Sequence, residues 1–212
     1  MKPAGTETPA KVEAVVFDIG RVIIQWDLRH LFAQLIEDEE ELDWFCANVV
    51  TEEWHFEHDA GRPLSEMLPE RKALFPQYTH LIDAYASRFL DTIPGPVHGT
   101  SDLIEQLSEQ EVPLFAITNF GAEFWPQFRA AQPVLDHFRD IVVSGDEKLA
   151  KPDPAIFELA CRRFGFSPQD MLFIDDNEAN TRAAKNLGWQ VHAFSNAEQL
   201  ARDLKARGLI NA

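Results

Sequence analysis

The 212-residue sequence predicts an α/β protein in which a parallel β-sheet carries helices on both faces and a helical insertion follows the first strand. Two observations predict this class. Short apolar runs alternate with stretches of helical periodicity, and parallel strands need such crossover helices between them. The first two apolar runs are separated by residues 18–112, which is far more chain than one crossover helix uses.

Five apolar runs have the length and composition of buried strands, at residues 12–17, 113–118, 140–144, 171–175 and 189–194. Helical periodicity lies between them, at 101–110, 154–165 and 178–187. Pro154 follows Asp153 at the start of the second of these helices, and Gly165 ends it, which is the usual pattern of start and stop signals. Gly188 ends the third helix in the same way.

The long stretch between the first two strands predicts a second, helical unit. Residues 28–50 and 79–93 have amphipathic periodicity, the turn-rich segment 58–66 lies between them, and 93–99 has the composition of a linker. We therefore expect a core domain of residues 1–24 and 95–212 and a cap domain of residues 25–94. The cap should cover the carboxyl edge of the sheet, where ligands bind in open α/β folds.

Composition narrows the classes of partner. The net charge of −16 disfavours a general surface for nucleic acid or for an anionic membrane, since both need Lys and Arg. No apolar run approaches the ~20 residues of a membrane span, and the polar N-terminus does not resemble a signal peptide. Cys46 and Cys161 offer no disulfide framework. We expect a cytoplasmic protein, monomer or homodimer, that acts on a small metabolite.

Polar residues follow four of the predicted strands directly or in the next loop. They are Asp18, the pair Thr118 and Asn119, Lys151, and the pair Asp175 and Asp176. Each alone has an ordinary explanation as a turn residue, a strand residue or a solvated lysine. Adjacent acids at the end of an apolar run are costly without a cation, however. Since the carboxyl ends of parallel strands share one edge, the sequence predicts that these side chains meet.

The chemistry of such a cluster favours phosphoryl transfer. Three carboxylates side by side need a hard divalent cation, and oxygen ligands suit Mg²⁺. Lys151 and Mg²⁺ would balance the charge of an incoming phosphoryl group, and Thr118 would bind its oxygens. Asp18 could attack phosphorus and form an aspartyl-phosphate, which water then hydrolyses.

Four stretches, VVFDIGRVI, FAITNFG, AKPDPAIF and FIDDNEANTRAAKNLG, resemble in their order the motifs of haloacid dehalogenase superfamily hydrolases with a helical cap after the first strand (subfamily I, C1 cap). The resemblance implies a Rossmann-like core, Mg²⁺ and a mobile cap. It implies that Asp18 is nucleophile and metal ligand, that Gly20 binds metal through its carbonyl, and that Asp176 is a metal ligand. It also implies that Thr118 and Lys151, beside Asn119, bind phosphate. Asp175 stands where many members have glycine, which indicates a supporting part in the metal site.

Two positions depart from the family pattern. Most phosphatases of the family carry a second aspartate, as general acid and base, where this chain has Gly20, and Asn180 stands where an aspartate is frequent. A subset with Phe-Asp-x-Gly at the first motif and Asp-Asp-Asn at the last, which includes phosphatases of glucose 1-phosphate, resembles this chain more closely. General acid help is worth about 10²–10⁴ in rate, so the absence of the acid favours substrates with good leaving groups, such as anomeric or acyl phosphates.

Alternatively, the cap supplies the acid. His55 and His58 are the candidates, with surface or packing positions as the plainer reading. Arg62 could contact an anionic substrate. Trp26, Trp44 and Trp54 either line the cap or belong to its core.

The sequence thus predicts a Mg²⁺-dependent phosphatase of a small phosphate monoester, with sugar phosphates among the candidates. Three alternatives stay open. A 2-haloacid dehalogenase needs no metal, although Gly20 and the acidic pair count against it. The second alternative is a receiver-type signalling domain, although such domains carry their acidic pair after the first strand and are much shorter than this chain. A degenerate member of the hydrolase family would bind phosphate esters without turnover.

Overall fold

The computed structural model describes residues 11–211. It contains a five-stranded sheet in the order β3-β2-β1-β4-β5, with every neighbouring pair parallel. The strands are β1 (Ala14–Phe17), β2 (Leu114–Thr118), β3 (Asp140–Val143), β4 (Met171–Asp175) and β5 (Gln190–Ala193). The predicted α/β class is confirmed. The N-terminal segment that we expect not to be a signal peptide lies mostly outside the described residues.

The register of the central strands brings the predicted site residues to one edge. β1, β2 and β4 are buried along their whole length, as expected for parallel strands covered on both faces. Phe17 of β1 pairs with Ile174 of β4. Asp18 and Asp175, the next residue of each segment, therefore lie side by side at the carboxyl edge of the sheet.

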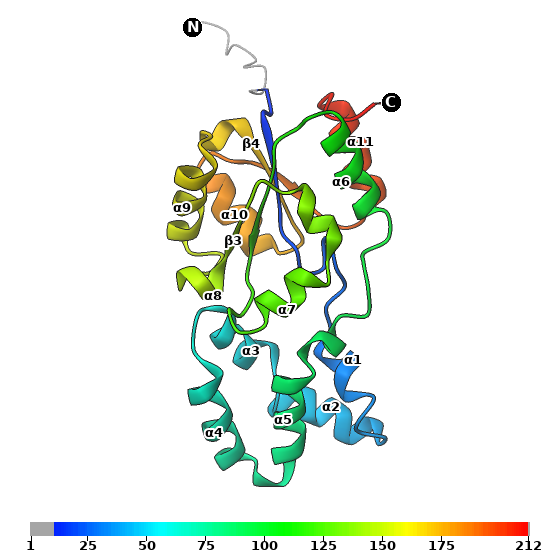
Figure 1. The fold of residues 1–212 in the computed structure, drawn as a ribbon, viewed down its shortest axis with the longest axis vertical. Coiled ribbons are helices and arrows are strands. Elements are labelled where there is room, and N and C mark those ends of the chain that lie inside the picture. Colours follow the sequence, from blue (N-terminus) through cyan, green and yellow to red (C-terminus); the bar gives the residue numbers. More distant parts are fainter. Residues whose placement is uncertain (1–10, 212) are drawn as a thin grey trace, which may run out of the picture.

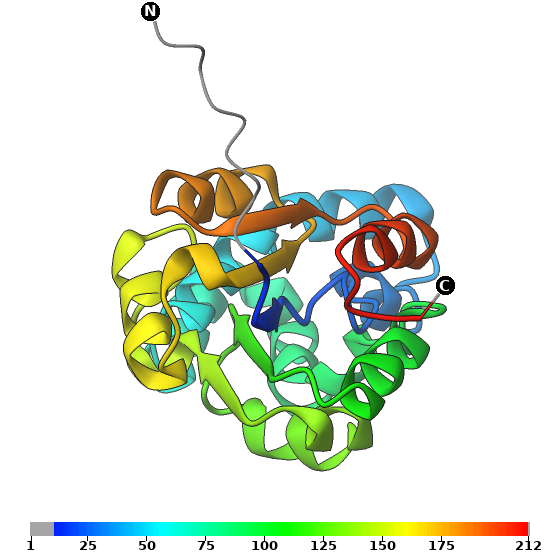
Figure 2. The same cartoon turned by 90° about the horizontal axis from the view of Figure 1, so that it is seen from above.

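Helices cover both faces of the sheet (Figures 1 and 2). On one face α9 (Pro154–Phe164) and α10 (Glu178–Asn186) enclose one hydrophobic cluster, and on the other α6 (Thr100–Glu109) and α11 (Ala197–Ala206) contribute to a second. α6, α9 and α10 agree with the helices expected from periodicity. Gly165 caps α9 with a φ of 78°, a left-handed conformation that favours glycine.

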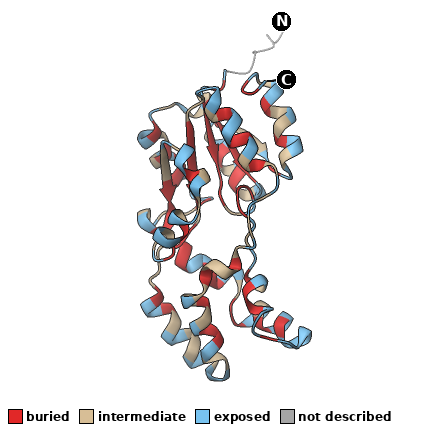
Figure 3. Cartoon of the chain, turned by 45° about the vertical axis from the view of Figure 1, so that its right-hand side comes forward, coloured by how far each residue is buried: buried red, intermediate tan, exposed pale blue. Residues whose placement is uncertain are grey.

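Short elements complete the core. They are the helices α7 (Trp125–Ala130) and α8 (Ser144–Glu147) and the 3₁₀ turns η3 (Pro133–His137) and η4 (Pro168–Asp170). In Figure 3 the buried residues are concentrated in the strands and on the inner sides of the helices. Among the described residues, no helix combines the length and apolar character needed to cross a bilayer.

The insertion after β1 is helical and lies at one end of the molecule, away from α6 and α11 (Figure 1). It contains α1 (Leu28–Phe32), α2 (Glu39–Asn48), α3 (Glu52–Asp59), α4 (Leu64–Leu74), η1 (Pro76–Tyr78), α5 (Thr79–Ser87) and η2 (Phe89–Thr92).

The helices of the insertion are more numerous than the periodicity of 28–50 and 79–93 indicates. The first segment breaks between α1 and α2, where the Asp38 side chain accepts a hydrogen bond from Glu41 N at 2.8 Å and caps α2. Thr51 caps the start of α3, which continues to Asp59, and α4 begins directly after Pro63. The turn expected over 58–66 is therefore shorter and spans residues 60–63.

Two extended segments connect the insertion to the core and are hydrogen-bonded to each other. Gln25 N donates to Gly95 O, and Val97 N donates to Ile23 O, both at 2.8 Å. The expected domain boundaries, 24/25 and 94/95, fall on this pair of connections. The division into two domains stays a prediction.

The insertion also packs on the loop that follows β2. The His58 ring lies edge-on to Phe124, and Phe89 stacks on the same Phe124 ring at 4.0 Å between centroids. Ser144 Oγ donates to the carbonyl of Asp59 at 2.5 Å and accepts from Phe120 N. His58 is almost fully buried, with Nδ1 2.9 Å from Arg62 O. Gly121 leaves room for that ring.

We expect Gly121→Ala to lower the free energy of unfolding by about 1–3 kcal/mol, the usual cost of overpacking. A Cβ on Gly121 would lie 2.1 Å from His58 Cδ2, so the buried ring would have to move. Urea denaturation measures the change. The matched control is Gly20→Ala, whose Cβ would meet nothing within 4 Å. In a His58→Ala background the cost of Gly121→Ala should shrink; an equal cost in both backgrounds would contradict the steric account.

Candidate active site

A cavity of about 160 Å³ lies between the carboxyl edge of the sheet and the helical insertion. Both parts of the chain line it. The core side includes Asp18, Gly20, Arg21, Asn119, Phe120, Lys151, Asp176, Asn177 and Asn180, and the cap side includes Trp26, His55, Asp59 and Phe89. The structure therefore brings together most of the residues that the sequence places at strand ends.

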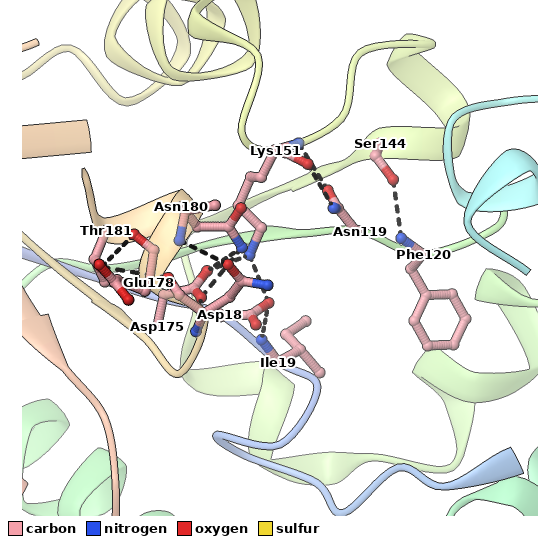
Figure 4. Close-up of polar contacts among 12 residues, drawn as sticks. Asp18, Ile19, Asn119, Phe120, Ser144, Lys151, Asp175, Glu178, Asn180 and Thr181 are labelled. Atoms are coloured by element: carbon pink, nitrogen blue, oxygen red, sulfur yellow. Dashed lines mark hydrogen bonds and ion pairs between the residues drawn. The ribbon is translucent and has the colours of Figure 1, made fainter. Parts of the chain in front are cut away.

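Lys151 is the centre of the polar network (Figure 4). Its ammonium group lies 2.7 Å from Asp18 Oδ1 and 2.8 Å from Asp175 Oδ2, and its side chain is fully buried. Burial alone would lower the pKa of Lys151, but the charges of Asp175 and Asp18 outweigh it and raise that pKa. Lys151 is thus a fixed cation, and its ordinary explanation as a solvated loop lysine is excluded.

Asn119 fixes the backbone of Lys151. Its Nδ2 donates to Lys151 O, and its Oδ1 accepts from Lys151 N, both at 2.9 Å. Asn119 follows β2 directly, so this pair of hydrogen bonds sets the loop after β3 against the end of β2. Thr118, the last residue of β2, is buried at the same edge but does not line the cavity. Its role in phosphate binding stays a prediction.

Asp175 is held on all sides. Besides Lys151, its carboxylate accepts from Asn177 N at 2.8 Å and from Asn180 Nδ2 at 3.1 and 3.2 Å. It is fully buried and does not line the cavity. The arrangement makes Asp175 the residue that positions Lys151, which agrees with a supporting rather than a direct part in a metal site.

Asp18 is poised at the end of β1. Its Oδ1 accepts from Ile19 N as well as from Lys151, both at 2.7 Å, while Oδ2 makes no hydrogen bond to the described residues. Burial raises the pKa of Asp18 to about 7, with Lys151 opposing the shift and Asp175 and Asp176 adding to it. Asp176 is exposed to the cavity, and burial followed by Asp175 raises its pKa as well.

These residues fit a hard divalent cation. Oxygen atoms of Asp18, Asp175 and Asp176 lie within 4.8 Å of one another. All are carboxylate oxygens, the donors that Mg²⁺ takes. Three carboxylates stand beside the one buried ammonium group of Lys151. Burial raises the pKa values of Asp18 and Asp176, and the neighbouring carboxylates add to both shifts. Asp18 and Asp176 face the cavity together with Gly20, so these three offer the open side of such a site.

The predicted cap residues separate in the structure. His55 lines the cavity, with Nδ1 2.7 Å from Tyr85 Oη and Nε2 3.2 Å from Asp59 Oδ2. His58 instead packs on Gly121 and does not reach the cavity lining. Both ring nitrogens of His55 thus have partners, and His58 lies outside the lining. A cap histidine as the missing acid stays a prediction.

Arg62 also lies outside the cavity lining. Its guanidinium pairs with Glu57 at 2.6 Å and with Glu70, so the arrangement does not provide the predicted substrate contact. Glu57 lies on α3 and Glu70 on α4, and the two carboxylates neutralise the charge of the Arg62 guanidinium. Of the three tryptophans, Trp26 lines the cavity, Trp54 is buried in the cap core and Trp44 is largely exposed.

Sequence reasoning missed five residues of the lining. They are Arg21, Ile24, Asp59, Phe89 and Phe120. Asp59 carried the one usable signal, since it stands four residues after His55 and residues at that spacing share a helix face. Arg21 has a φ of 59°, pairs with Glu52 of α3 and lies 4.9 Å from the centre of the Trp26 ring. No local pattern marks that position.

Several curated proteins with related sequences are named phosphatases. A phosphoglycolate phosphatase of Nitrosospira multiformis is 34% identical over 146 residues, which are 68% of this chain and 60% of that protein. A validoxylamine A 7'-phosphate phosphatase of Streptomyces hygroscopicus is 26% identical over 68% of this chain and 74% of that protein. This chain thus spans less than two thirds of the Nitrosospira protein.

The fold also has solved counterparts. A magnesium complex of a HAD family enzyme from Bacteroides thetaiotaomicron superposes with a TM-score of 0.71 at 17% identity, covering 92% of this chain and all of that one. The sequence profile of the haloacid dehalogenase-like hydrolases matches residues 12–188, which include β1 to β4, the insertion and every residue of the polar network around Lys151. The chain belongs to this family of hydrolases.

Proposed function

We propose that this protein is a Mg²⁺-dependent phosphatase that hydrolyses a small phosphate monoester through an aspartyl-phosphate on Asp18. The observation that carries the proposal is the buried Lys151 ammonium between Asp18 and Asp175, with Asp18 and Asp176 lining the same cavity. The names of the related phosphatases, whose substrates are small phosphate esters, support it.

Asp18 is the nucleophile of the proposed reaction. Lys151 and Ile19 N hold Oδ1 and thereby orient the carboxylate, and Oδ2 is the oxygen left to attack phosphorus. The new oxygen–phosphorus bond forms as the bond to the leaving alcohol breaks, and the alkoxide takes a proton from water. A second water then attacks the phosphorus, releases phosphate and restores the carboxylate.

Charge balance assigns the remaining roles. Asp18, Asp176 and the Gly20 carbonyl would hold Mg²⁺, with Asp175 in support. The ion would offset the charges of the carboxylates and of the phosphoryl group. Lys151 adds a fixed positive charge on the other side of Asp18. Thr118 and Asn119 at the end of β2 complete the proposed phosphate-binding set.

The cavity suits a small phosphorylated metabolite, with sugar phosphates among the candidates. Because Gly20 stands where most phosphatases of the family carry an aspartate, no general acid at that position protonates the leaving group. This favours anomeric or acyl phosphates, whose leaving groups are good. The cytoplasmic location and the monomeric or homodimeric state stay predictions.

Phosphate release from p-nitrophenyl phosphate or glucose 1-phosphate should require Mg²⁺, stop with EDTA and fall to background in Asp18→Asn. Mass spectrometry of acid-quenched wild type should show one added phosphoryl group, absent from the variant. The matched control is Asp102→Asn, an exposed acid in α6 far from the cavity. Chloride release from 2-chloropropionate that is insensitive to EDTA would instead support a dehalogenase.

Mg²⁺ binding should weaken as the pH falls through about 7, the raised pKa of Asp18. Below that pH the carboxyl group holds a proton that must leave before the cation binds, so the affinity should drop about tenfold per pH unit and level off above it. Isothermal titration calorimetry from pH 5.5 to 8.5 measures the slope. Asp18→Asn should flatten it, and a flat profile in the wild type argues against Asp18 as a ligand.

Gly20→Asp should raise turnover of a primary alkyl phosphate such as glucose 6-phosphate, by up to about 10²-fold, because it supplies the general acid that the leaving group lacks. The structure has space for the side chain, since a Cβ on Gly20 meets no atom within 4 Å. Glucose 1-phosphate, with the better leaving group, should gain less. Gly20→Ala is the control for the effect of a side chain without a carboxyl group. Equal rates of Gly20→Asp and Gly20→Ala would refute the role of Asp at position 20 as a general acid.

A further inference from the structure

The cap side of the cavity carries a buried carboxylate that the proposed chemistry does not use. Asp59, the last residue of α3, lines the cavity and is 6% exposed. Its Oδ2 lies 3.2 Å from His55 Nε2, but its Oδ1 is buried and makes no hydrogen bond to any described residue. An unpaired buried carboxylate oxygen is costly. A donor brought by a ligand would remove that cost.

His55 fixes the orientation of Asp59. Its ring lies between Trp26 and Phe89, stacked on both at 4.9 and 5.4 Å between centroids. Burial raises the pKa of Tyr85 well above its ordinary value, so its hydroxyl keeps its proton and can donate to His55 Nδ1, 2.7 Å away. Nε2–H then donates to Asp59 Oδ2. Asp59 therefore presents an acceptor whose position is set by packing.

The cations of the cavity are already paired with acids. Lys151 lies between Asp18 and Asp175, and Arg21 pairs with Glu52. Among the side chains that line the described cavity, Asp59 is the carboxylic acid on the cap side. A second negative group on the substrate would meet Asp59 and would find no unpaired lysine or arginine in the lining.

We propose that Asp59 is a specificity-determining residue, which accepts a hydrogen bond from a hydroxyl group of the leaving alcohol and excludes leaving groups that carry a carboxylate. This inference rests on the proposed phosphatase function and names its substrate class: phosphate esters of polyhydroxy compounds rather than of hydroxy acids. The selectivity follows from one residue, since a carboxylate has no proton to donate to Asp59 and repels it.

The test compares glucose 1-phosphate with 2-phosphoglycolate, using p-nitrophenyl phosphate as the reference substrate with Mg²⁺. Wild type should prefer glucose 1-phosphate. Asp59→Asn, which keeps the shape and loses the charge, should lower the ratio of the two kcat/KM values about tenfold to a hundredfold, the usual worth of a hydrogen bond to a charged group. Glu53→Gln removes a charge from an exposed position of the same helix and should leave the ratio unchanged.

An unchanged ratio in folded Asp59→Asn, checked by circular dichroism, would overturn the inference. A wild-type preference for 2-phosphoglycolate would do the same. If wild type releases phosphate from none of the three esters, the phosphatase proposal fails on its own. Calorimetry then still tests the role of Asp59. The Asp18→Asn variant should bind glucose 1-phosphate more tightly than 2-phosphoglycolate, and the double variant Asp18→Asn/Asp59→Asn should show a smaller difference in affinity between the two ligands. The same affinity difference in both proteins, or no binding by either protein, counts against the inference.

Discussion

The buried ammonium group of Lys151 is the interaction on which the arrangement of the site depends. A lone buried cation would be strongly destabilising, and so would either of two neighbouring carboxylates without it. Lys151 comes from the loop after β3, Asp18 from the end of β1 and Asp175 from the end of β4. Their mutual need for charge compensation thus joins three segments that are distant in sequence, and it fixes the carboxyl edge of the sheet in one geometry.

The amide groups around this triad follow from the same constraint. Asp175 already lies beside Asp18 and Asp176, so another acid at position 180 would add a negative charge to a cluster that Lys151 does not balance. Asn180 instead donates to both oxygens of Asp175. This gives a physical reason for the departure from the family pattern at position 180. Gly20 has no comparable structural reason, since a side chain would fit there.

The sequence predicts the core of this site well and its cap side poorly, and the cause is physical. Buried parallel strands are continuous apolar runs, so the polar residue that ends each one stands out, and the sheet then places Asp18, Asp175 and Lys151 together without further information. The cap has no such rule. Trp26, Asp59 and Phe89 come from three segments whose approach depends on packing between helices. The amphipathic periodicity of residues 28–50 does not mark the break before Asp38, and it could not reveal that His55 faces the cavity while His58 faces Gly121.

The charged groups at the two ends of the cavity are compensated in different ways. In the proposed function, the core end carries out the reaction and the cap end selects the substrate. At the core end, the surplus of carboxylates over Lys151 calls for a cation, which also suits a phosphoryl group. At the cap end, Asp59 is tied to a histidine that is itself held between two rings, so its unpaired oxygen cannot turn towards a protein donor. A ligand that enters the cavity can satisfy it. A substrate without a matching hydroxyl would leave that oxygen unpaired. The proposed substrate choice therefore depends on one carboxylate of the cap, whereas the proposed chemistry depends on the charges at the edge of the sheet.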